Sequence, residues 1–554
     1  MTASIAFATE ELYPFGPGGI GRLVHHLVFQ ALRERTSNVH LFVGSSLGLS
    51  QERVQAVFGP RVTASTFEGA ALDPLARSLA LAEQVTSHCD RHEPFEWIEL
   101  PDFRGLGFAT LHQAATRGLR GSPRLAVRIH GPNSVVSWHE DQPIDATRAA
   151  EFDLERSSLL LADQVIAPLG AVRDAVADFF RFDDAWRERV RLSLPPRTAG
   201  QAAPSPAQAV SRIIFPTKAQ GIKRPDLFVS GVTELLRRRP RWAGQVALAA
   251  HRNPEIEASL FHAMSREVRA RFEWVSWNDA ERARHFAGQV VVIPSDFETL
   301  SLAAWEAAEV GARVVASTRC PAFAEGSRWT AWPGFHGFDG TVSGLAGALE
   351  RALDSAAPPP LSVPPSPLWK AEPAPSSARA VSVSPEEIAI VGGGLEDWTR
   401  QLGEITTPWV LLLRAADEVE AEAFRRAAAT ALSRRSAAAV VSAAAVGLGS
   451  PTQAWASTRP PSGAIVASTE LARQVISPTS GRRALLAVAS QLGLECLYLF
   501  VPSRAPASDE ERFPPLTLDA HPLAVRAQRD GEPPLRKRVL KSARDNLKRL
   551  LRRR

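Results

Sequence analysis

The sequence predicts an α/β protein built from open sheets, with about three domains in its 554 residues. Three segments carry this prediction. In each, an apolar run typical of a buried strand ends at a turn that leads into a helix-forming stretch, at residues 5–33, 212–237 and 290–309. Gly311 and another apolar run follow the last helix and complete a strand–helix–strand unit. Alternating strands and helices indicate sheets covered by helices.

The first segment predicts a glycine-rich loop between a strand at residues 5–10 and a helix at residues 23–33. Gly18 and Gly19 precede this helix. Glycines let the backbone approach a phosphate closely and leave the helix N-terminus free to face it. Glycines before helices are often needed only for the shape of the turn. The position directly after a first strand nevertheless favours a functional loop.

The second segment predicts two cations in a turn. Lys218 and Lys223 lie between a strand that begins at Arg212 and a helix at residues 226–237. Two lysines flanking a turn are commonly only solvated. The strand before them and the helix after them favour an anion-binding role.

The third segment places two carboxylates after a buried strand. Residues 290–293 are followed by Glu298 and, eight residues later, by Glu306. Eight residues are about two helical turns, so we expect both carboxylates on nearly the same face of a helix. The helix N-terminus favours an anion and carboxylates accept hydrogen bonds from hydroxyls, which suits a polyhydroxylated ligand with phosphates. The alternative is a surface helix with two solvated glutamates.

A histidine follows a further predicted strand. The run that begins at Val127 ends at His130 and Gly131. A histidine at the carboxyl end of a strand can reach into a cleft, which makes His130 a candidate site residue. A structural histidine bonded to the backbone is the alternative.

The carboxylate segment resembles the donor-site motif of retaining glycosyltransferases of the GT-B class, family 4. That motif has a first glutamate, a short turn and a second glutamate followed by alanine, as at Glu298 and Glu306. The glycine loop, the His-Gly pair and the lysine turn resemble family segments in the same order. The resemblance covers residues 1–355.

The chain departs from the family at two places. Thr299, Leu300 and Ser301 replace the more usual glycine, aromatic residue and glycine of the turn. Lys218 replaces an arginine, which keeps the charge but loses the planar fork that binds phosphate in a bidentate way.

The resemblance implies a GT-B fold, with two Rossmann-like domains and an interdomain cleft. A nucleotide-diphosphate sugar would bind the second domain, and the acceptor would enter from the first. The implied roles are His130 and Glu298 as catalytic residues at the reacting sugar, Glu306 at the ribose, Lys218 and Lys223 at the diphosphate, the amides of Thr299, Leu300 and Ser301 at the departing phosphate, and Gly18 and Gly19 across the cleft.

Composition predicts the division of the chain. We expect an N-terminal acceptor domain (1–197), a linker (198–209), a donor domain (210–355), a Pro-rich linker (356–380), a small α/β domain (381–506), a linker (507–534) and a basic tail (535–554). The third domain weakly resembles a degenerate GT-A glycosyltransferase of family 2, because residues 414–416 lack its metal-binding aspartates. An unrelated α/β domain is the alternative.

The tail predicts a basic amphipathic helix. Residues 536–554 hold ten Lys and Arg and one Asp, a charge of +9, whereas the whole chain carries +5. Apolar residues recur among the cations at helical spacing, which indicates binding to an anionic membrane surface. RNA binding and a solvated tail are the competing interpretations. The tail has no aromatic residues for base stacking, so we expect no nucleic-acid partner.

Composition also limits the compartment and the cofactors. No apolar run is long enough to span a membrane, the N-terminus leads directly into a strand, and the three cysteines are far apart. We therefore expect a cytoplasmic protein, peripheral on the inner face of the plasma membrane. No spacing indicates a metal site, and we expect no cofactor beyond the nucleotide sugar as co-substrate.

Together these features predict a retaining glycosyltransferase that moves a sugar from a nucleotide-diphosphate sugar to a hydroxyl of a glycan or lipid-linked acceptor, in cell-surface glycan or glycolipid assembly. The alternative is a catalytically inactive, glycosyltransferase-like scaffold at the membrane. A nucleotide-sugar epimerase of the same fold is a second rival, and it would gain little from a membrane tail.

Overall fold

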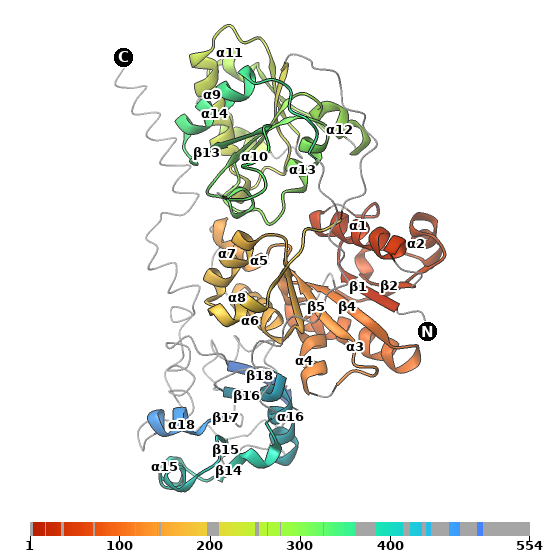
Figure 1. The fold of residues 1–554 in the computed structure, drawn as a ribbon, viewed down its shortest axis with the longest axis vertical. Coiled ribbons are helices and arrows are strands. Elements are labelled where there is room, and N and C mark those ends of the chain that lie inside the picture. Colours follow the sequence, from red (N-terminus) through yellow and green to blue (C-terminus); the bar gives the residue numbers. More distant parts are fainter. Residues whose placement is uncertain are drawn as a thin grey trace.

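The described part of the computed structural model contains three β-sheets, each in its own part of the chain (Figure 1). The N-terminal domain lies between the other two. The structure describes residues 4–196, 210–361, 383–413, 421–434, 439–444, 465–476 and 496–501, apart from residues 17, 35–37, 70–72, 117, 141, 143–145, 250–253, 263, 278 and 325.

The N-terminal domain is a seven-stranded parallel sheet in the order β3-β2-β1-β4-β5-β6-β7. Its strands are β1 (Ser4–Thr9), β2 (Val39–Gly44), β3 (Val62–Phe67), β4 (Phe95–Pro101), β5 (Arg124–Arg128), β6 (Gln164–Ala167) and β7 (Arg191–Leu192). Connections from β1 run first to one side of the sheet and then to the other. The order therefore reverses between β1 and β4, where open sheets of this kind bind ligands.

Helices cover both faces of this sheet, so its central strands are buried on both sides. They are α1 (Gly19–Glu34), α2 (Gln51–Phe58), α3 (Pro74–Arg91), α4 (Phe108–Thr116), α5 (Asn133–His139), α6 (Ala146–Leu161), α7 (Gly170–Phe180) and α8 (Asp184–Arg189), with short 3-10 turns η1 (Ser45–Leu47) and η2 (Phe103–Gly105). Alternate residues of β1 face opposite sides of the sheet and belong to different apolar cores. Ile5 and Phe7 pack on one face, and Ala6 and Ala8 on the other.

The second domain repeats this plan with a six-stranded parallel sheet in the order β10-β9-β8-β11-β12-β13. Its elements are β8 (Arg212–Phe215), η3 (Gly221–Lys223), α9 (Pro225–Arg238), β9 (Gln245–Leu248), α10 (Pro254–Phe261), α11 (Arg266–Arg269), β10 (Phe272–Trp274), α12 (Asp279–Phe286), β11 (Val290–Ile293), α13 (Leu302–Glu309), β12 (Arg313–Ser317), η4 (Pro321–Phe323), β13 (Phe335–Phe338) and α14 (Val342–Asp354). Here the order reverses between β8 and β11, the strands that precede the predicted lysine turn and carboxylate loop.

The third domain has a mixed five-stranded sheet in the order β14-β15-β17-β16-β18. Its elements are η5 (Pro385–Glu387), β14 (Ile388–Gly392), α15 (Leu395–Glu404), β15 (Trp409–Leu413), α16 (Ala421–Arg434), β16 (Ala439–Ala444), β17 (Ile465–Ser468), α18 (Thr469–Val475) and β18 (Cys496–Val501). Helix α16 lies against α4 of the N-terminal domain (Figure 1). Phe424 and Ala428 of α16 belong to the same apolar core as Leu111 and Ala114 of α4.

The predicted Pro-rich linker begins later than residue 356. The Trp332 indole donates a hydrogen bond to the Pro359 carbonyl (3.0 Å), and the Leu361 amide donates to the Ala308 carbonyl (2.9 Å). Residues 356–361 therefore pack on the second domain. The two predicted linkers at 198–209 and 507–534, the rest of the Pro-rich segment and the basic tail at 535–554 lie outside the described residues. No helix in the described part of the chain is long and apolar enough to cross a membrane.

Candidate active site between the two Rossmann-like domains

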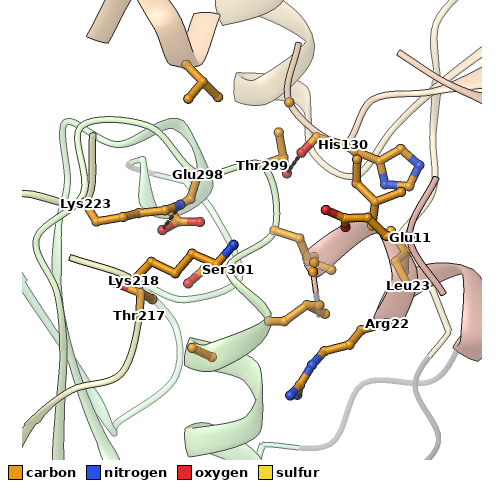
Figure 2. Close-up of a pocket in the computed structure, with 18 of the residues that line it drawn as sticks. Glu11, Arg22, Leu23, His130, Thr217, Lys218, Lys223, Glu298, Thr299 and Ser301 are labelled. Atoms are coloured by element: carbon orange, nitrogen blue, oxygen red, sulfur yellow. Dashed lines mark hydrogen bonds and ion pairs between the residues drawn. The ribbon is translucent and has the colours of Figure 1, made fainter. Parts of the chain in front are cut away.

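A cavity of about 900 Å³ lies between the first two domains (Figure 2). Its lining includes the loops after β1, β4 and β5 on one side and the loops after β8, β10 and β11 on the other. The cavity therefore joins the two ligand-binding edges that the sheet orders define. All ten residues that the sequence analysis singled out line this cavity.

Lys223 and Glu298 form an ion pair on the second-domain side of the cavity. The Lys223 Nζ lies 2.8 Å from Glu298 Oε1, and the Ser295 hydroxyl donates to the same oxygen at 2.8 Å. Glu298 is 8% exposed, so the pair is shielded from most of the solvent. Lys218, by contrast, is exposed, and its side chain extends into the pocket (Figure 2). Two ammonium groups thus face the cavity from this domain.

Arg224 fixes the turn that carries Lys223, and the sequence analysis missed it. Its guanidinium donates to Asp226 at 3.0 Å and to Asp296 at 3.1 Å. The Asp296 amide also donates to the Ile222 carbonyl (2.9 Å). These bonds tie the turn after β8 to the loop after β11, which brings Lys223 beside Glu298.

The two glutamates do not share a helix, which corrects the sequence-based expectation. Helix α13 begins at Leu302, so Glu298 lies in the preceding loop and only Glu306 is helical. The cause is Ser301, whose φ of +57° is left-handed and incompatible with a helical start at residue 298. The turn of residues 299–301 precedes the α13 N-terminus, where unpaired amides favour an anion.

Glu306 is ion-paired on both sides. Its Oε1 lies 3.3 Å from Arg22 Nη1, and its Oε2 lies 3.1 Å from Arg282 Nε. Arg22 belongs to α1 of the first domain and Arg282 to α12 of the second. Glu306 therefore links the two domains across the cavity, a contact that the sequence analysis did not anticipate.

His130 lies two residues after β5, at the carboxyl end of this strand as predicted. The backbone amides of His130 and Gly131 donate to the Asp102 carboxylate at 3.0 and 3.2 Å. The Thr299 hydroxyl of the second domain donates to the His130 carbonyl at 2.9 Å. Burial, followed by the nearby Arg128 charge, lowers the pKa of His130 to about 3, so its imidazole is neutral at neutral pH.

Buried carboxyl groups hold the backbone around His130. Glu155 accepts hydrogen bonds from the amides of Asn133 (2.6 Å), Ser134 (3.0 Å) and Arg104 (2.7 Å). Burial raises the pKa of Glu155 to about 8 and that of Asp102 to about 7. The position of Asp102, one residue after a strand, was the one sequence signal for these two groups.

The glycine loop lies against a carboxylate that the sequence analysis also missed. Gly18 has a φ of +151°, and a Cβ there would clash with the Glu11 carboxylate. Gly19 is the first residue of α1 and has open space around it. Glu11 lines the cavity at the end of β1, and burial raises its pKa above the ordinary value. Its place between a predicted strand and a glycine loop could have marked it as a candidate.

The site can bind an anion and hydroxyl groups at once. Lys218, Lys223 and the α13 N-terminus supply positive charge or amide donors on one side. Glu298, Glu11 and the neutral His130 supply hydrogen-bond acceptors nearby. Within the described ranges, no group of three His, Cys, Asp or Glu side chains could hold a metal ion.

Comparison with known proteins places the chain near glycosyltransferases. A D-inositol 3-phosphate glycosyltransferase of Kineococcus radiotolerans is 29% identical over 184 residues, which is 29% of this chain and 41% of that relative. The match therefore spans less than half of that relative. A D-inositol 3-phosphate glycosyltransferase 2 of Catenulispora acidiphila is 25% identical over 387 residues, 64% of this chain and 88% of the relative. No protein-family model matches the chain.

Solved structures also match at low sequence identity. A sucrose-phosphate synthase from Thermosynechococcus elongatus is 17% identical, with a TM-score of 0.48 over 63% of this chain and 90% of that chain. WaaG, a glycosyltransferase involved in lipopolysaccharide biosynthesis, is 12% identical, with a TM-score of 0.46 over 63% of this chain and 90% of that chain. The architecture itself, two parallel Rossmann-like sheets facing each other across a cavity, is the GT-B fold and confirms the predicted fold of this region.

Proposed function

We propose that the protein is a retaining, metal-independent glycosyltransferase that moves a sugar, of the hexosyl type, from a nucleotide-diphosphate sugar to an acceptor hydroxyl. One observation carries the proposal: Lys223, Glu298 and the start of α13 converge on a cavity whose other wall holds His130. Both sequence relatives are named as glycosyltransferases, which supports the same class.

In this proposal the second domain holds the donor. Lys218, Lys223 and the amides of the 299–301 turn stabilise the negative charge that grows on the departing diphosphate, which is the largest electrostatic demand of the reaction. Glu298 accepts hydrogen bonds from sugar hydroxyls and keeps Lys223 in place. Glu306 holds the ribose once it has released Arg22.

The acceptor hydroxyl attacks the anomeric carbon on the face that the diphosphate leaves, which retains the anomeric configuration. His130 contacts the sugar near the reacting carbon. Its imidazole is neutral and its carbonyl and amide are held by neighbours, so it contributes a positioned polar surface and no charge.

The names of the relatives give a first acceptor to test. Both act on D-inositol 3-phosphate according to their names, and a phosphorylated polyol is a small hydroxyl acceptor. A glycan or lipid-linked acceptor, a role in cell-surface glycan assembly and attachment of residues 535–554 to an anionic membrane on the cytoplasmic side remain part of the proposal.

The experiment is a donor panel of UDP-, GDP- and ADP-sugars, read by thermal stabilisation and by release of nucleoside diphosphate. We expect one donor to stabilise the protein and to be turned over. Glu298→Gln and Lys223→Ala should each lower turnover about 100-fold or more without unfolding the protein. Glu309→Gln, on the same helix as Glu306 but away from the cavity lining, is the matched control. Wild-type turnover in Glu298→Gln and Lys223→Ala would contradict the proposal.

A catalytically inactive scaffold is the second candidate, and the paired state of Glu306 favours it. An acid already bonded to Arg22 and Arg282 is less free to hold a ribose. This candidate predicts no stabilisation and no release with any donor of the panel.

A further inference from the structure

Glu11 is a carboxylate on the first-domain wall of the cavity, opposite the lysines. It follows β1, next to the point where the strand order of the first sheet reverses. Figure 2 shows its carboxylate beneath His130, pointing toward the part of the pocket that Lys218 and Ser301 face. Lys218 is close enough to act on it electrostatically.

The end of β1 and the start of α1 hold Glu11 in this place. The Glu11 amide donates to the Thr9 hydroxyl (3.1 Å), which in turn donates to the Glu11 carbonyl (2.5 Å). The amide of Gly21, in the first turn of α1, donates to the carboxylate Oε2 at 3.4 Å. The carboxylate is therefore oriented by backbone groups before any ligand binds.

The glycines of the loop make room for this carboxylate. A Cβ at Gly18 would occupy its position, and a Cβ at Gly21 would lie 2.8 Å from the backbone of Glu11 and Leu12. The sequence pattern that indicated a phosphate loop thus also serves to bring a negative charge to the cavity wall.

Charge varies along the cavity: the first-domain lining also holds Arg22, Arg104, Arg128 and Arg148, and Glu11 makes the part beside it negative. A diphosphate is attracted to Lys218 and Lys223 and is repelled by a carboxylate, because like charges in a partly buried site disfavour each other. Hydroxyl groups, by contrast, donate strong hydrogen bonds to a carboxylate. The position beside Glu11 therefore suits an uncharged, hydroxylated part of a ligand.

We propose that Glu11 binds the hydroxyl groups of the acceptor and selects an acceptor with a neutral polyol ring at this position. This inference rests on the proposed glycosyl transfer and adds the chemistry of the acceptor subsite to it. Any charged group of the acceptor then points away from Glu11.

The test compares Glu11→Ala and Glu11→Gln with Glu10→Gln. Glu10 is the neighbouring carboxylate, paired with Arg77 at 3.3 Å and outside the cavity lining, so it is a matched control. The donor is the nucleotide sugar that stabilises the wild type. D-inositol 3-phosphate and myo-inositol are the acceptor probes, and the KM for donor and acceptor is measured separately.

We expect the acceptor KM of Glu11→Ala to rise about tenfold or more, because a hydrogen bond to a charged group is lost. Glu11→Gln should fall between Ala and wild type, since its amide oxygen still accepts one hydrogen bond. The donor KM and the donor-induced thermal shift should change by less than about twofold. Glu10→Gln should match the wild type.

Two results would overturn the inference while leaving the proposed function intact. One is an unchanged acceptor KM in Glu11→Ala with normal donor binding. The other is a donor KM that rises as much as the acceptor KM, which would assign Glu11 to the donor. A wild type that binds no donor of the panel overturns the proposed function, and the acceptor role of Glu11 falls with it.

Discussion

Ser301 and Arg224 share an uncommon backbone conformation beside the cavity. Both have a positive φ, +57° at Ser301 and +53° at Arg224. Residues other than glycine rarely adopt this backbone region, and those that do are often found at functional turns. Here one residue shapes the turn before α13 and the other the turn that carries Lys223.

We expect Ser301→Gly to stabilise the protein. Glycine adopts the left-handed region without strain, and the substitution also removes a buried hydroxyl that lacks a hydrogen bond in the structure. The gain should be about 0.5–1 kcal/mol, measured as the free energy of unfolding in urea. Ser301→Val should lose stability, because a β-branched residue fits this region poorly. Equal stability of the two variants would contradict the assignment of strain to residue 301.

Individual site residues were predictable where the signal lies within one short segment of the sequence. They were less predictable where the partner of a residue lies far away in the sequence. Lys223 and Glu298 could be named from strand–turn–helix patterns, and the structure pairs them. The pairing of Glu306 with Arg22 could not be predicted, because these residues are 284 positions apart and belong to different domains. Glu11 was missed although its place between a predicted strand and a glycine loop is visible in the sequence, because only the structure shows that Gly18 and Gly21 leave room for its side chain.

At the scale of the elements, the strand orders of the two parallel sheets explain where the candidate site lies. Each parallel sheet reverses its direction of winding once, at β1 and β4 in the first domain and at β8 and β11 in the second. The loops that carry the candidate residues follow three of these four strands or, for His130, the next strand β5. The hydrophobic pattern predicted these strands correctly because fully buried strands form continuous apolar runs. It placed the start of α13 too early, because the pattern does not report a left-handed turn residue.

A buried histidine between β2 and β3 should make the stability of the fold depend on pH. His40 of β2 is buried, and its ring nitrogens lie 2.8 Å from the Thr63 hydroxyl and 3.0 Å from the Ser65 hydroxyl of β3. Burial first, and then the neighbouring His88 and His92 of α3 and the turn after it, lower the pKa of His40 to about 3. The folded protein therefore keeps this imidazole neutral at pH values where an unfolded chain protonates it.

His40 should destabilise the fold in mild acid. The unfolded pKa is about 6.5, so the stability that the neutral ring contributes is complete above that pH and is lost as the pH falls toward 3. Between pH 6.5 and 5 the loss should reach up to about 2 kcal/mol. His40→Gln, which can bond both hydroxyls without titrating, should show a flatter dependence of Tm on pH. His262→Gln, at an exposed histidine, is the control, and an unchanged slope in His40→Gln would contradict the expectation.

At the scale of the whole molecule, the contacts between described residues that bridge the cavity include three specific ones. They are the Arg22–Glu306 ion pair (3.3 Å), the hydrogen bond from Thr299 to the His130 carbonyl (2.9 Å), and the stacking of His139 on Phe297 at 6.0 Å between ring centroids. All three join the first domain to the second. They hold the two cavity walls together.

We expect Arg22→Met to shift the free protein toward a more open arrangement. The ion pair is partly exposed, with side chains 27% and 22% accessible, so its contribution is below about 1 kcal/mol and the shift in population is modest. Small-angle scattering should show a larger radius of gyration than for the wild type. Arg53→Met, whose guanidinium bonds within the first domain, should leave the scattering unchanged. Identical curves for Arg22→Met and the wild type would contradict a closing role.

The shared core of α4 and α16 has a consequence for how this chain can change over generations. Leu111 and Ala114 of α4 share one apolar core with Phe424 and Ala428 of α16, more than 300 positions later in the sequence, and the two helices are in contact. A substitution on either helix alters a surface that the other must match. The third domain therefore cannot be exchanged for another without regard to the first domain, whereas within the described residues no element of the second domain packs extensively on either helix.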